Sequence, residues 1–317
     1  MAETMIKVEN VHRRFRNVQA VGGLSFSCAA NSVVGFIGAN GAGKTTTMRM
    51  MVTLDNPDHG LIEMAGYDTL AHPREVRNLV GWMPDHYGAY PNMDVLDYMD
   101  FFARAYHLRG TKRRARIDEV MDFTELNRLA ERPCQTLSKG EKQRLCLGRT
   151  LLSDPKVLIL DEPAAGLDPK ARLEFKNLVR QLKQMGKTLF ISSHILSELG
   201  EMCDSLLFID AGRLVHHGDA DSLTNGSVEG LVLRILTKGA PEKLQQFIEQ
   251  HEQMAVRENL PKGASVNFVI EDGGNVEDSL HELLQTLLAH GIEVYDFHRE
   301  PKRLEDAFVD MLTIKKN

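Results

Sequence analysis

The sequence lacks any apolar run long enough to cross a membrane. A membrane-spanning helix needs about 20 predominantly apolar residues, and no such stretch occurs in the 317 residues. The first residues, MAETMIKVENVHRRF, also lack the apolar core of a secretory signal. We therefore expect a chain that neither spans a membrane nor leaves the cytoplasm unaided.

Cysteine is scarce, and basic residues are not in excess. The four cysteines, Cys28, Cys134, Cys146 and Cys203, form no Cys-x-x-Cys pair, so neither a zinc site nor a disulfide framework is expected. The 38 Lys and Arg residues against 44 Asp and Glu give a formal net charge of -6. Because phosphate backbones are bound by basic surfaces, this charge argues mildly against a protein that wraps nucleic acid.

What is present is an ordinary globular composition, with 43% hydrophobic and 26% charged residues. The length favours one large domain and a smaller one. Residues 1 to about 30 alternate polar and apolar, which predicts half-buried antiparallel strands. Nearly continuous apolar runs then predict strands covered on both faces of a parallel sheet: Val33–Ile37, Val157–Leu160, Thr188–Ser192 and Leu206–Ile209.

Two further regions interrupt or follow this sheet. Val95, Met99, Phe102 and Tyr106 recur at helical spacing and predict a core-facing stripe within a helical insertion over about 92–150. A turn at 210–212 and a polar loop at 223–227 predict a domain boundary near 222, hence a larger domain over 1–221 and a small C-terminal α+β domain over 222–317. The second domain is predicted to contain strands at 231–236, 265–270 and 292–297, and helices at 241–251, 276–290 and 303–314.

Residues 38–45 read GANGAGKT, which matches the phosphate-loop pattern G-x-x-x-x-G-K-[ST]. The match follows the predicted strand Val33–Ile37 and precedes a helix predicted to start at Thr46, the context that supports ATP binding over a turn that binds nothing. Glycines let backbone N–H groups wrap a triphosphate. Lys44 is expected to neutralise the outer phosphates, and the Thr45 hydroxyl to ligate Mg²⁺. The expected nucleotide contacts in this segment are Gly38, Asn40, Gly41, Ala42, Gly43, Lys44, Thr45 and Thr46.

Carboxylates follow the predicted strand Val157–Leu160. Asp161 is expected to hold Mg²⁺, and Glu162 to accept a proton from the attacking water or orient it, because both lie at the carboxyl edge of a parallel sheet beside the phosphate loop. His194 ends the next apolar run at the same edge. We expect His194 to sense or polarise the γ-phosphate, and a purely structural histidine is the alternative. Lys44, Glu162 and His194 are thus the predicted catalytic residues.

Residues 137–147 read LSKGEKQRLCL, and Gly166, Leu167 and Asp168 follow the carboxylate pair. With the phosphate loop, these motifs make residues 4–220 resemble an ABC (ATP-binding cassette) ATPase of the drug, polysaccharide and sodium exporter branch. The family signature is LSGGQ; Leu137, Ser138 and Gly140 match it, whereas Lys139 and Glu141 depart from it. The resemblance implies an α/β P-loop core with an antiparallel N-terminal β subdomain and a helical insertion.

The resemblance also implies a head-to-tail pair of subunits, in which Ser138, Gly140 and Glu141 of one cover the ATP held by the other. The residues agree, because Ser138 and the Gly140 amide at a helix start offer N–H donors to a second anion. Phe15 matches the aromatic that stacks on adenine, although a packed edge-strand phenylalanine is the alternative. Asp168 matches the residue that links the two nucleotide sites, with a helix cap as the alternative.

One departure concerns the metal. Where the family has a glutamine that touches Mg²⁺, residues 81–86 read GWMPDH, and the resemblance makes Asp85 the candidate ligand. The basic run at 112–116 is interpreted as a solvated helix face, with a lipid-headgroup contact as the alternative. The segment Leu304–Phe308 resembles the tail of exporter-type subunits.

These observations predict an enzyme that hydrolyses ATP to ADP and phosphate, with ATP and Mg²⁺ joining two subunits and hydrolysis releasing them. The resemblance implies a separate integral-membrane permease, docked near Asp85–Tyr90 at the inner face of the cell membrane, with export favoured and no nucleic-acid partner. A soluble ABC ATPase acting on DNA or ribosomes is the alternative, but such chains usually carry two cassettes or a long coiled coil. A module that holds ATP without hydrolysis is less favoured, because Lys44, Asp161, Glu162 and His194 occur together.

Overall fold

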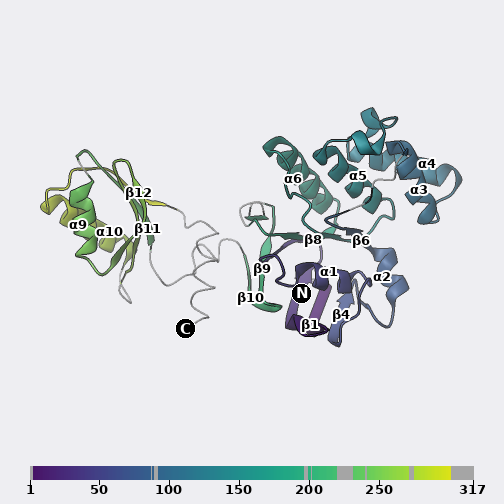
Figure 1. Ribbon diagram of the computed structural model, residues 1–317, viewed down its shortest axis with the longest axis horizontal. Helices are drawn as coiled ribbons and strands as arrows, with labels where there is room; N and C mark the ends of the chain where they lie inside the picture. The colour runs from purple at the N-terminus through teal and green to yellow at the C-terminus, as the bar shows by residue number, and fades with distance from the viewer. Residues whose placement is uncertain are drawn as a thin grey trace. The chain divides into compact units, whose positions relative to one another are not determined.

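The computed structural model describes residues 3–86, 88, 92–195, 199–200, 202–219, 231–239, 241–270 and 275–300. The chain divides into two compact units, Met1–Ala220 and Asp221–Asn317, and each is described by itself (Figure 1). Within the described ranges, no helix is both long and apolar enough to pass through a membrane.

The first unit is built on a six-stranded sheet of order β10-β9-β3-β8-β7-β6. Strands β9, β3, β8, β7 and β6 run parallel, and β10 pairs antiparallel with β9. Every residue of β3, β7 and β8 is buried, so the apolar runs correctly predicted strands covered on both faces. The strand bounds are β3 Val33–Ile37, β6 Val80–Met83, β7 Val157–Leu160, β8 Thr188–Ser193, β9 Ser205–Asp210 and β10 Arg213–Gly218.

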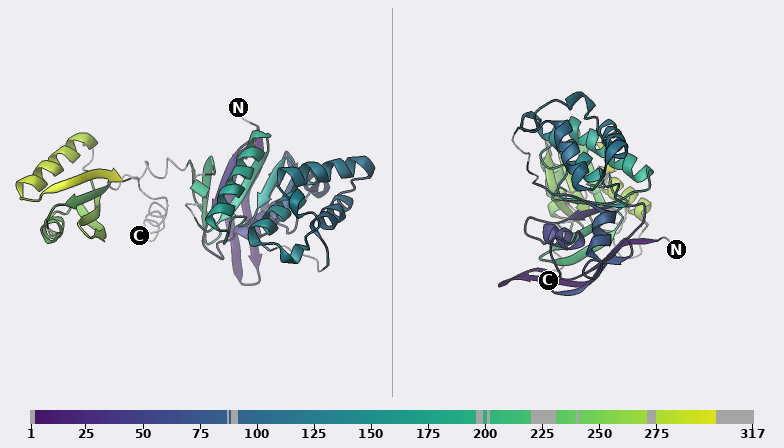
Figure 2. Two further views of the ribbon diagram at one scale, coloured as in Figure 1. Left: turned by 90° about the horizontal axis from the view of Figure 1, so that it is seen from above. Right: turned by 90° about the vertical axis from the view of Figure 1, so that its right-hand side faces the viewer.

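Helices cover both faces of this sheet. In Figure 1, α3, α4, α5 and α6 lie above the sheet, and α1, α2, β1 and β4 lie below it; the right-hand view of Figure 2 shows the same separation. The helices of the described first unit are α1 Lys44–Met51, α2 Pro73–Leu79, α3 Val95–Ala105, α4 Gly110–Phe123, α5 Lys139–Leu151 and α6 Pro169–Gln184, with short 3₁₀ turns η1 Asn127–Leu129 and η2 Cys134–Thr136.

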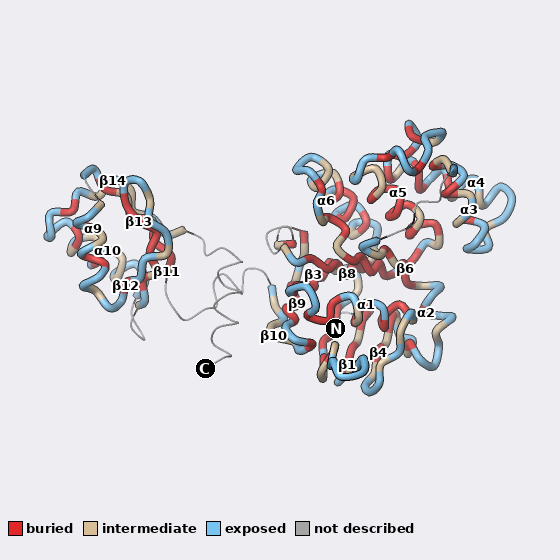
Figure 3. The backbone as a smooth tube through the Cα atoms, in the orientation of Figure 1, coloured by how far each residue is buried: buried red, intermediate tan, exposed pale blue. Residues whose placement is uncertain are grey.

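An antiparallel sheet of order β2-β1-β4-β5 forms the N-terminal subdomain that the alternating pattern predicted. Its packing joins the two sheets into one core (Figure 3). The Phe26 ring stacks on Phe190 of β8 with centroids 5.6 Å apart, and Phe36 of β3 lies 5.1 Å from Phe190. The strand bounds are β1 Thr4–Phe15, β2 Val18–Ala29, β4 His59–Met64 and β5 Tyr67–Asp68.

Helix α3 corresponds to the helical stripe predicted from the sequence. Asp94 caps its start by accepting a hydrogen bond from the Asp97 amide. Val95 and Met99 are fully buried, but Tyr106 follows the helix and is 39% exposed, so the prediction of a continuous core stripe is wrong at its end. Tyr98, which lies one residue before Met99, is fully buried instead, because the buried face turns with the 3.6-residue period.

The second unit is a β-α-β-β-α-β fold with antiparallel strand order β12-β13-β11-β14, a ferredoxin-like arrangement. Its core includes Leu233 and Ile235 of β11 and Leu287 of α10. Edge strand β12 was not predicted, because its residues are mostly exposed and its sequence, MAVRENL, does not alternate polar and apolar residues. The predicted helix at 303–314 and the Leu304–Phe308 tail lie outside the described residues. The element bounds are β11 Leu231–Thr237, α9 Glu242–Glu249, β12 Met254–Leu260, β13 Gly263–Phe268, α10 Val276–Ala289 and β14 Val294–Glu300.

Candidate nucleotide-binding and hydrolysis site

The phosphate loop runs from the end of β3 into α1, and its glycines are required by the backbone. Gly41 and Gly43 have φ angles of 83° and 105°, in the left-handed region that favours glycine. A Cβ on Gly43 would lie 2.4 Å from the Ala20 carbonyl oxygen, and one on Gly38 would lie 2.5 Å from the Ile209 carbonyl oxygen. Helix α1 begins at Lys44, two residues before the predicted start at Thr46, because the loop turns directly into the helix after Gly43.

Lys44 is buried, with 6% of its surface exposed. Its Nζ donates hydrogen bonds to the carbonyl oxygens of Gly38 at 2.7 Å and Ala39 at 3.4 Å. The same Nζ lies 3.4 Å from Glu162 Oε1. The ammonium group therefore connects the phosphate loop to the end of β7, and a bound phosphate would have to compete with these contacts.

Asp161 is buried at the end of β7 between two hydroxyl donors. Thr45 Oγ1 donates to Asp161 Oδ2 at 2.8 Å, and Ser192 Oγ donates to Asp161 Oδ1 at 2.6 Å. Burial raises the pKa of Asp161; the Ser192 and Thr45 hydrogen bonds oppose this shift, and the negative charges of Glu162 and Asp85 add to it. Clustered negative charge with carboxylate and hydroxyl oxygens fits a hard divalent cation such as Mg²⁺.

Both the side chain and the backbone of Glu162 make polar contacts. His194 Nδ1 lies 2.8 Å from Glu162 Oε2, and the Glu162 backbone N–H donates to Ser192 Oγ at 2.8 Å. Glu162 also has a φ angle of 49°, a strained conformation for a residue with a side chain. Ser192 thus joins Asp161 to Glu162. Sequence reasoning missed Ser192, although a serine that directly follows the apolar run of β8 was the available signal.

Asp85 follows β6, the strand beside β7. Its carboxylate Oδ2 lies 2.8 Å from His86 Nδ1, and its charge contributes to the raised pKa of Asp161. Asp85 therefore lies at the same sheet edge as Asp161, where its side chain pairs with His86. Of the predicted docking segment, Tyr87, Ala89 and Tyr90 lie outside the described residues.

Phe15 ends β1 and is 43% exposed, so it is not a packed core residue. The Arg13 guanidinium carbon lies 4.5 Å from the centre of the Phe15 ring. Arg13 in turn pairs with Asp55 at 2.7 Å and with Asp58 at 2.9 Å. These ion pairs hold a cation against an accessible aromatic ring.

Ser138 is the N-cap of α5 and forms a reciprocal capping box with Glu141. The Glu141 amide donates to Ser138 Oγ at 3.3 Å, and the Ser138 amide donates to Glu141 Oε2 at 2.8 Å. Arg132 Nη1 lies 3.1 Å from Glu141 Oε1. Burial disfavours the charged Glu141, but the Ser138 hydrogen bonds and Arg132 outweigh it and lower its pKa. Glu141, which stands where the family signature has glutamine, thus keeps the start of α5 capped.

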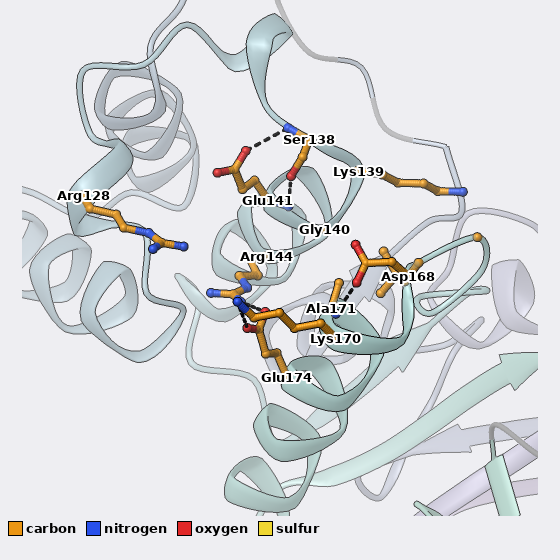
Figure 4. Close-up of a pocket in the computed structure, with 12 residues that line it drawn as sticks. Arg128, Ser138, Lys139, Gly140, Glu141, Arg144, Asp168, Lys170, Ala171 and Glu174 are labelled. Atoms are coloured by element: carbon orange, nitrogen blue, oxygen red, sulfur yellow. Dashed lines mark hydrogen bonds and ion pairs between the residues drawn. The ribbon is translucent and has the colours of Figure 1, made fainter.

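The first turns of α5 and α6 border a pocket of about 320 Å³ (Figure 4). Asp168 caps α6 by accepting a hydrogen bond from the Ala171 amide at 2.8 Å. The helices approach closely here, because a Cβ on Gly140 would lie 3.0 Å from the Ala171 methyl group. Ser138, Gly140, Glu141 and Asp168 all line this pocket, whereas no residue of Gly38–Thr45 does. The predicted site residues therefore fall into two separate groups.

Arg144, in the second turn of α5, was not predicted from the sequence. Only 8% of this residue is exposed. Its guanidinium pairs with Glu125, before η1, and with Glu174 of α6. This double ion pair ties the signature helix to both the helical insertion and α6.

A parallel sheet with a glycine-rich phosphate loop after one strand and a carboxylate pair after another is the architecture of a P-loop ATPase. The model of the ABC transporter family matches residues 21–165. The chain is also 35% identical over 237 residues to "Daunorubicin resistance ATP-binding protein DrrA3" of Streptomyces coeruleorubidus, covering 74% of this chain and 75% of that protein. The chain belongs to the ABC transporter family.

Other comparisons agree. "Nod factor export ATP-binding protein I" of Ralstonia nicotianae is 35% identical, over 69% of this chain and 68% of that protein. "Probable multidrug ABC transporter ATP-binding protein YbhF" of Escherichia coli is 30% identical over 98% of this chain and 53% of that protein. The structure of cbiO1 from Clostridium perfringens, part of the cbiONQ transporter complex, matches with a TM-score of 0.64 and 26% identity, over 70% of this chain and 90% of that one.

The predicted fold, enzyme class and general function are thereby confirmed. The chain is an ATP-binding, ATP-hydrolysing subunit of the kind that powers a transporter. The relatives support the transport function over the alternative of a soluble ABC ATPase that acts on nucleic acid or ribosomes.

Proposed function

We propose that two subunits of this kind close head to tail, so that Ser138 and Gly140 of one cover the ATP bound at Gly38–Thr45 of the other. The observation that carries the proposal is the separation of the two groups of site residues, because the signature pocket contains no part of the chain's own phosphate loop. A closed pair with twofold symmetry would complete two identical sites. A dimeric bacterial ABC transporter cassette, 22% identical, has the same fold with a TM-score of 0.62.

Within each closed site, Glu162 would orient the attacking water and accept its proton. Two contacts limit the motion of its carboxylate: His194 Nδ1 at 2.8 Å from one oxygen and Lys44 Nζ at 3.4 Å from the other. We assign Lys44 and His194 to the γ-phosphate and Phe15 to the adenine ring. Mg²⁺, held by Thr45 and Asp161 with Asp85 as a further candidate ligand, would neutralise charge on the phosphate oxygens.

The transport role requires a membrane partner. We propose that an integral-membrane permease, a separate chain, docks near Asp85 and brings this subunit to the inner face of the cell membrane. The names of the drug-resistance and Nod factor export relatives favour export as the direction. We further propose that residues 1–221 form the ATPase domain and that the ferredoxin-like domain at 222–317 is accessory.

The Glu162→Gln variant tests this function. Loss of the general base should lower phosphate release by roughly 10²–10⁴-fold, while ATP affinity stays unchanged. Because the ATP-bound state then accumulates, sedimentation in ATP and Mg²⁺ should detect a dimer. Unchanged turnover would contradict the role of Glu162, and a variant that stays monomeric in saturating ATP would contradict the closed pair.

A further inference from the structure

The ferredoxin-like domain contains a pocket that the ATPase cycle does not use. Its volume is about 420 Å³, and its described lining comes from the second unit alone. Small-molecule sites in proteins usually measure about 300–1,000 Å³. The pocket is therefore large enough for a small organic ligand, and the chemistry of its lining indicates which kind.

Part of the lining is apolar. Phe268 ends β13, Ile270 lies two residues beyond it, and Leu283 belongs to α10. Phe268 and Leu283 are buried members of the domain core, whereas Val269, which also lines the pocket, is 44% exposed. The Val269 amide donates to the Gln253 carbonyl oxygen at 2.8 Å, which fixes this corner of the domain. These side chains offer a surface that the apolar body of a ligand can cover.

The hydroxyl groups of the pocket have already used their protons. Ser279 Oγ donates to the Asn275 carbonyl oxygen at 2.9 Å, and Thr286 Oγ1 donates to the Glu282 carbonyl oxygen at 2.8 Å. A hydroxyl group has one O–H donor and two acceptor lone pairs. Both hydroxyl oxygens therefore have only acceptor capacity left for a ligand.

His251 has the same character. Its Nδ1 lies 2.7 Å from the Phe247 carbonyl oxygen, which can only accept, so Nδ1 carries the proton. In the neutral ring, Nε2 is then an acceptor. The His251 ring also stacks on Phe247, with centroids 3.9 Å apart, and this contact holds the ring in place.

Glu282 adds a carboxylate to these acceptors. It shares one face of α10 with Ser279, Leu283 and Thr286, because the four positions follow helical spacing. In the part of the chain that the structure describes, the exposed Glu282 carboxylate makes no ion pair or hydrogen bond. No lysine or arginine occurs among the described residues that line the pocket. The polar part of the lining is thus rich in acceptors and has no cation.

We propose that this pocket binds an organic amine, whose ammonium group pairs with Glu282 and donates to the hydroxyl oxygens of Ser279 and Thr286. The apolar body of the amine covers Phe268 and Leu283. An ammonium group has donors and no acceptor, which complements this lining, and a hydrogen bond between charged partners is the stronger kind. An anionic ligand would meet a carboxylate with no neighbouring cation, and a purely apolar ligand would leave the acceptors unpaired. This site is independent of the proposed head-to-tail pair.

The test titrates the full-length protein with tryptamine, an amine on an apolar ring system, and follows labelled methyl groups by NMR. The methyl signals of Val269, Ile270 and Leu283 should shift, which locates the site and gives the dissociation constant. Glu282→Gln keeps the side-chain shape but removes the charge, so it should raise that constant about tenfold or more. The neutral analogue tryptophol and the anionic analogue indole-3-propionate should each bind the parent at least about tenfold more weakly.

Glu277→Gln is the matched control, because it removes the same charge from an exposed position on α10 that does not line the pocket. It should bind tryptamine like the parent. An unchanged unfolding midpoint in Glu282→Gln shows that weaker binding is not a loss of folding. Equal affinity of Glu282→Gln and the parent, equal binding of tryptophol or indole-3-propionate, or tryptamine shifts confined to other methyl groups would each overturn the inference.

Discussion

The phosphate-loop edge and the signature pocket balance charge in different ways. At the phosphate-loop edge, the charged side chains Lys44, Asp161 and Glu162 contact one another or neighbouring polar groups. In the signature pocket, Glu141 completes the cap of α5, Asp168 caps α6, and Glu174 pairs with Arg144. The first region thus holds its charged groups beside one another for the nucleotide, whereas the second uses its carboxylates to fix the ends and the packing of helices.

The largest expected effect is on ATP binding at the phosphate loop. Lys44→Ala should weaken ATP binding by about 100-fold or more, because several contacts of a buried cation with the phosphates are lost and each is worth about 1.5–3 kcal/mol. Equilibrium binding of a fluorescent ATP analogue measures this. Lys7→Ala is the control, since Lys7 pairs with Glu9 and Glu63 on the N-terminal sheet and its loss should not change ATP affinity. Unchanged affinity in Lys44→Ala would contradict the assignment of the loop.

An intermediate effect is expected at Arg144, the cation of the signature pocket that pairs with two carboxylates. Arg144→Met should lower the free energy of unfolding by about 1.5–3 kcal/mol, the range for hydrogen bonds to charged groups, because Glu125 and Glu174 lose their shared partner. Arg104→Met, at an exposed pair with Asp100, should cost no more than about 1 kcal/mol. Chemical denaturation measures both, and equal losses would contradict a special role for Arg144.

The smallest expected effect distinguishes two roles of Asp168, the cap of α6 and a link between subunits. Asp168→Ala should cost about 1 kcal/mol of stability through loss of the N-cap, whereas Asp168→Asn should cost only a few tenths, because asparagine also caps helices well. Denaturation gives the stability and sedimentation gives the dimerisation. Weaker dimerisation of the stable Asp168→Asn variant would support a link across the interface. If neither property changes in Asp168→Asn, the residue is a cap alone.

Much of the fold could be predicted because burial on both faces of a sheet leaves a direct trace in the sequence. The runs Val33–Ile37 and Val157–Leu160 became β3 and β7 for that reason. Strand β6 was not predicted, because its four residues include Gly81 and its pairing with β7 decides its conformation. Edge strand β12 was missed for a similar reason, because its pairing with β13 depends on the tertiary structure.

Within the candidate site, motif residues were predictable and their supports were not. Phosphate binding and metal binding demand particular residue types at fixed spacing, so Lys44, Thr45 and Asp161 stand out in the sequence. Ser192, which joins Asp161 to the backbone of Glu162, lies 31 residues from Asp161. Nothing local predicts that contact.

The sequence by itself determined that this chain carries a phosphate loop, a strand-end carboxylate pair and a variant ABC signature, because local motifs need only neighbouring residues. Only the tertiary structure decided which charged side chains pair with one another. The pairing of Arg144 with Glu125 and Glu174 joins residues 19 and 30 positions apart. Charge balance depends on distances in space, which the order of residues along the chain does not give.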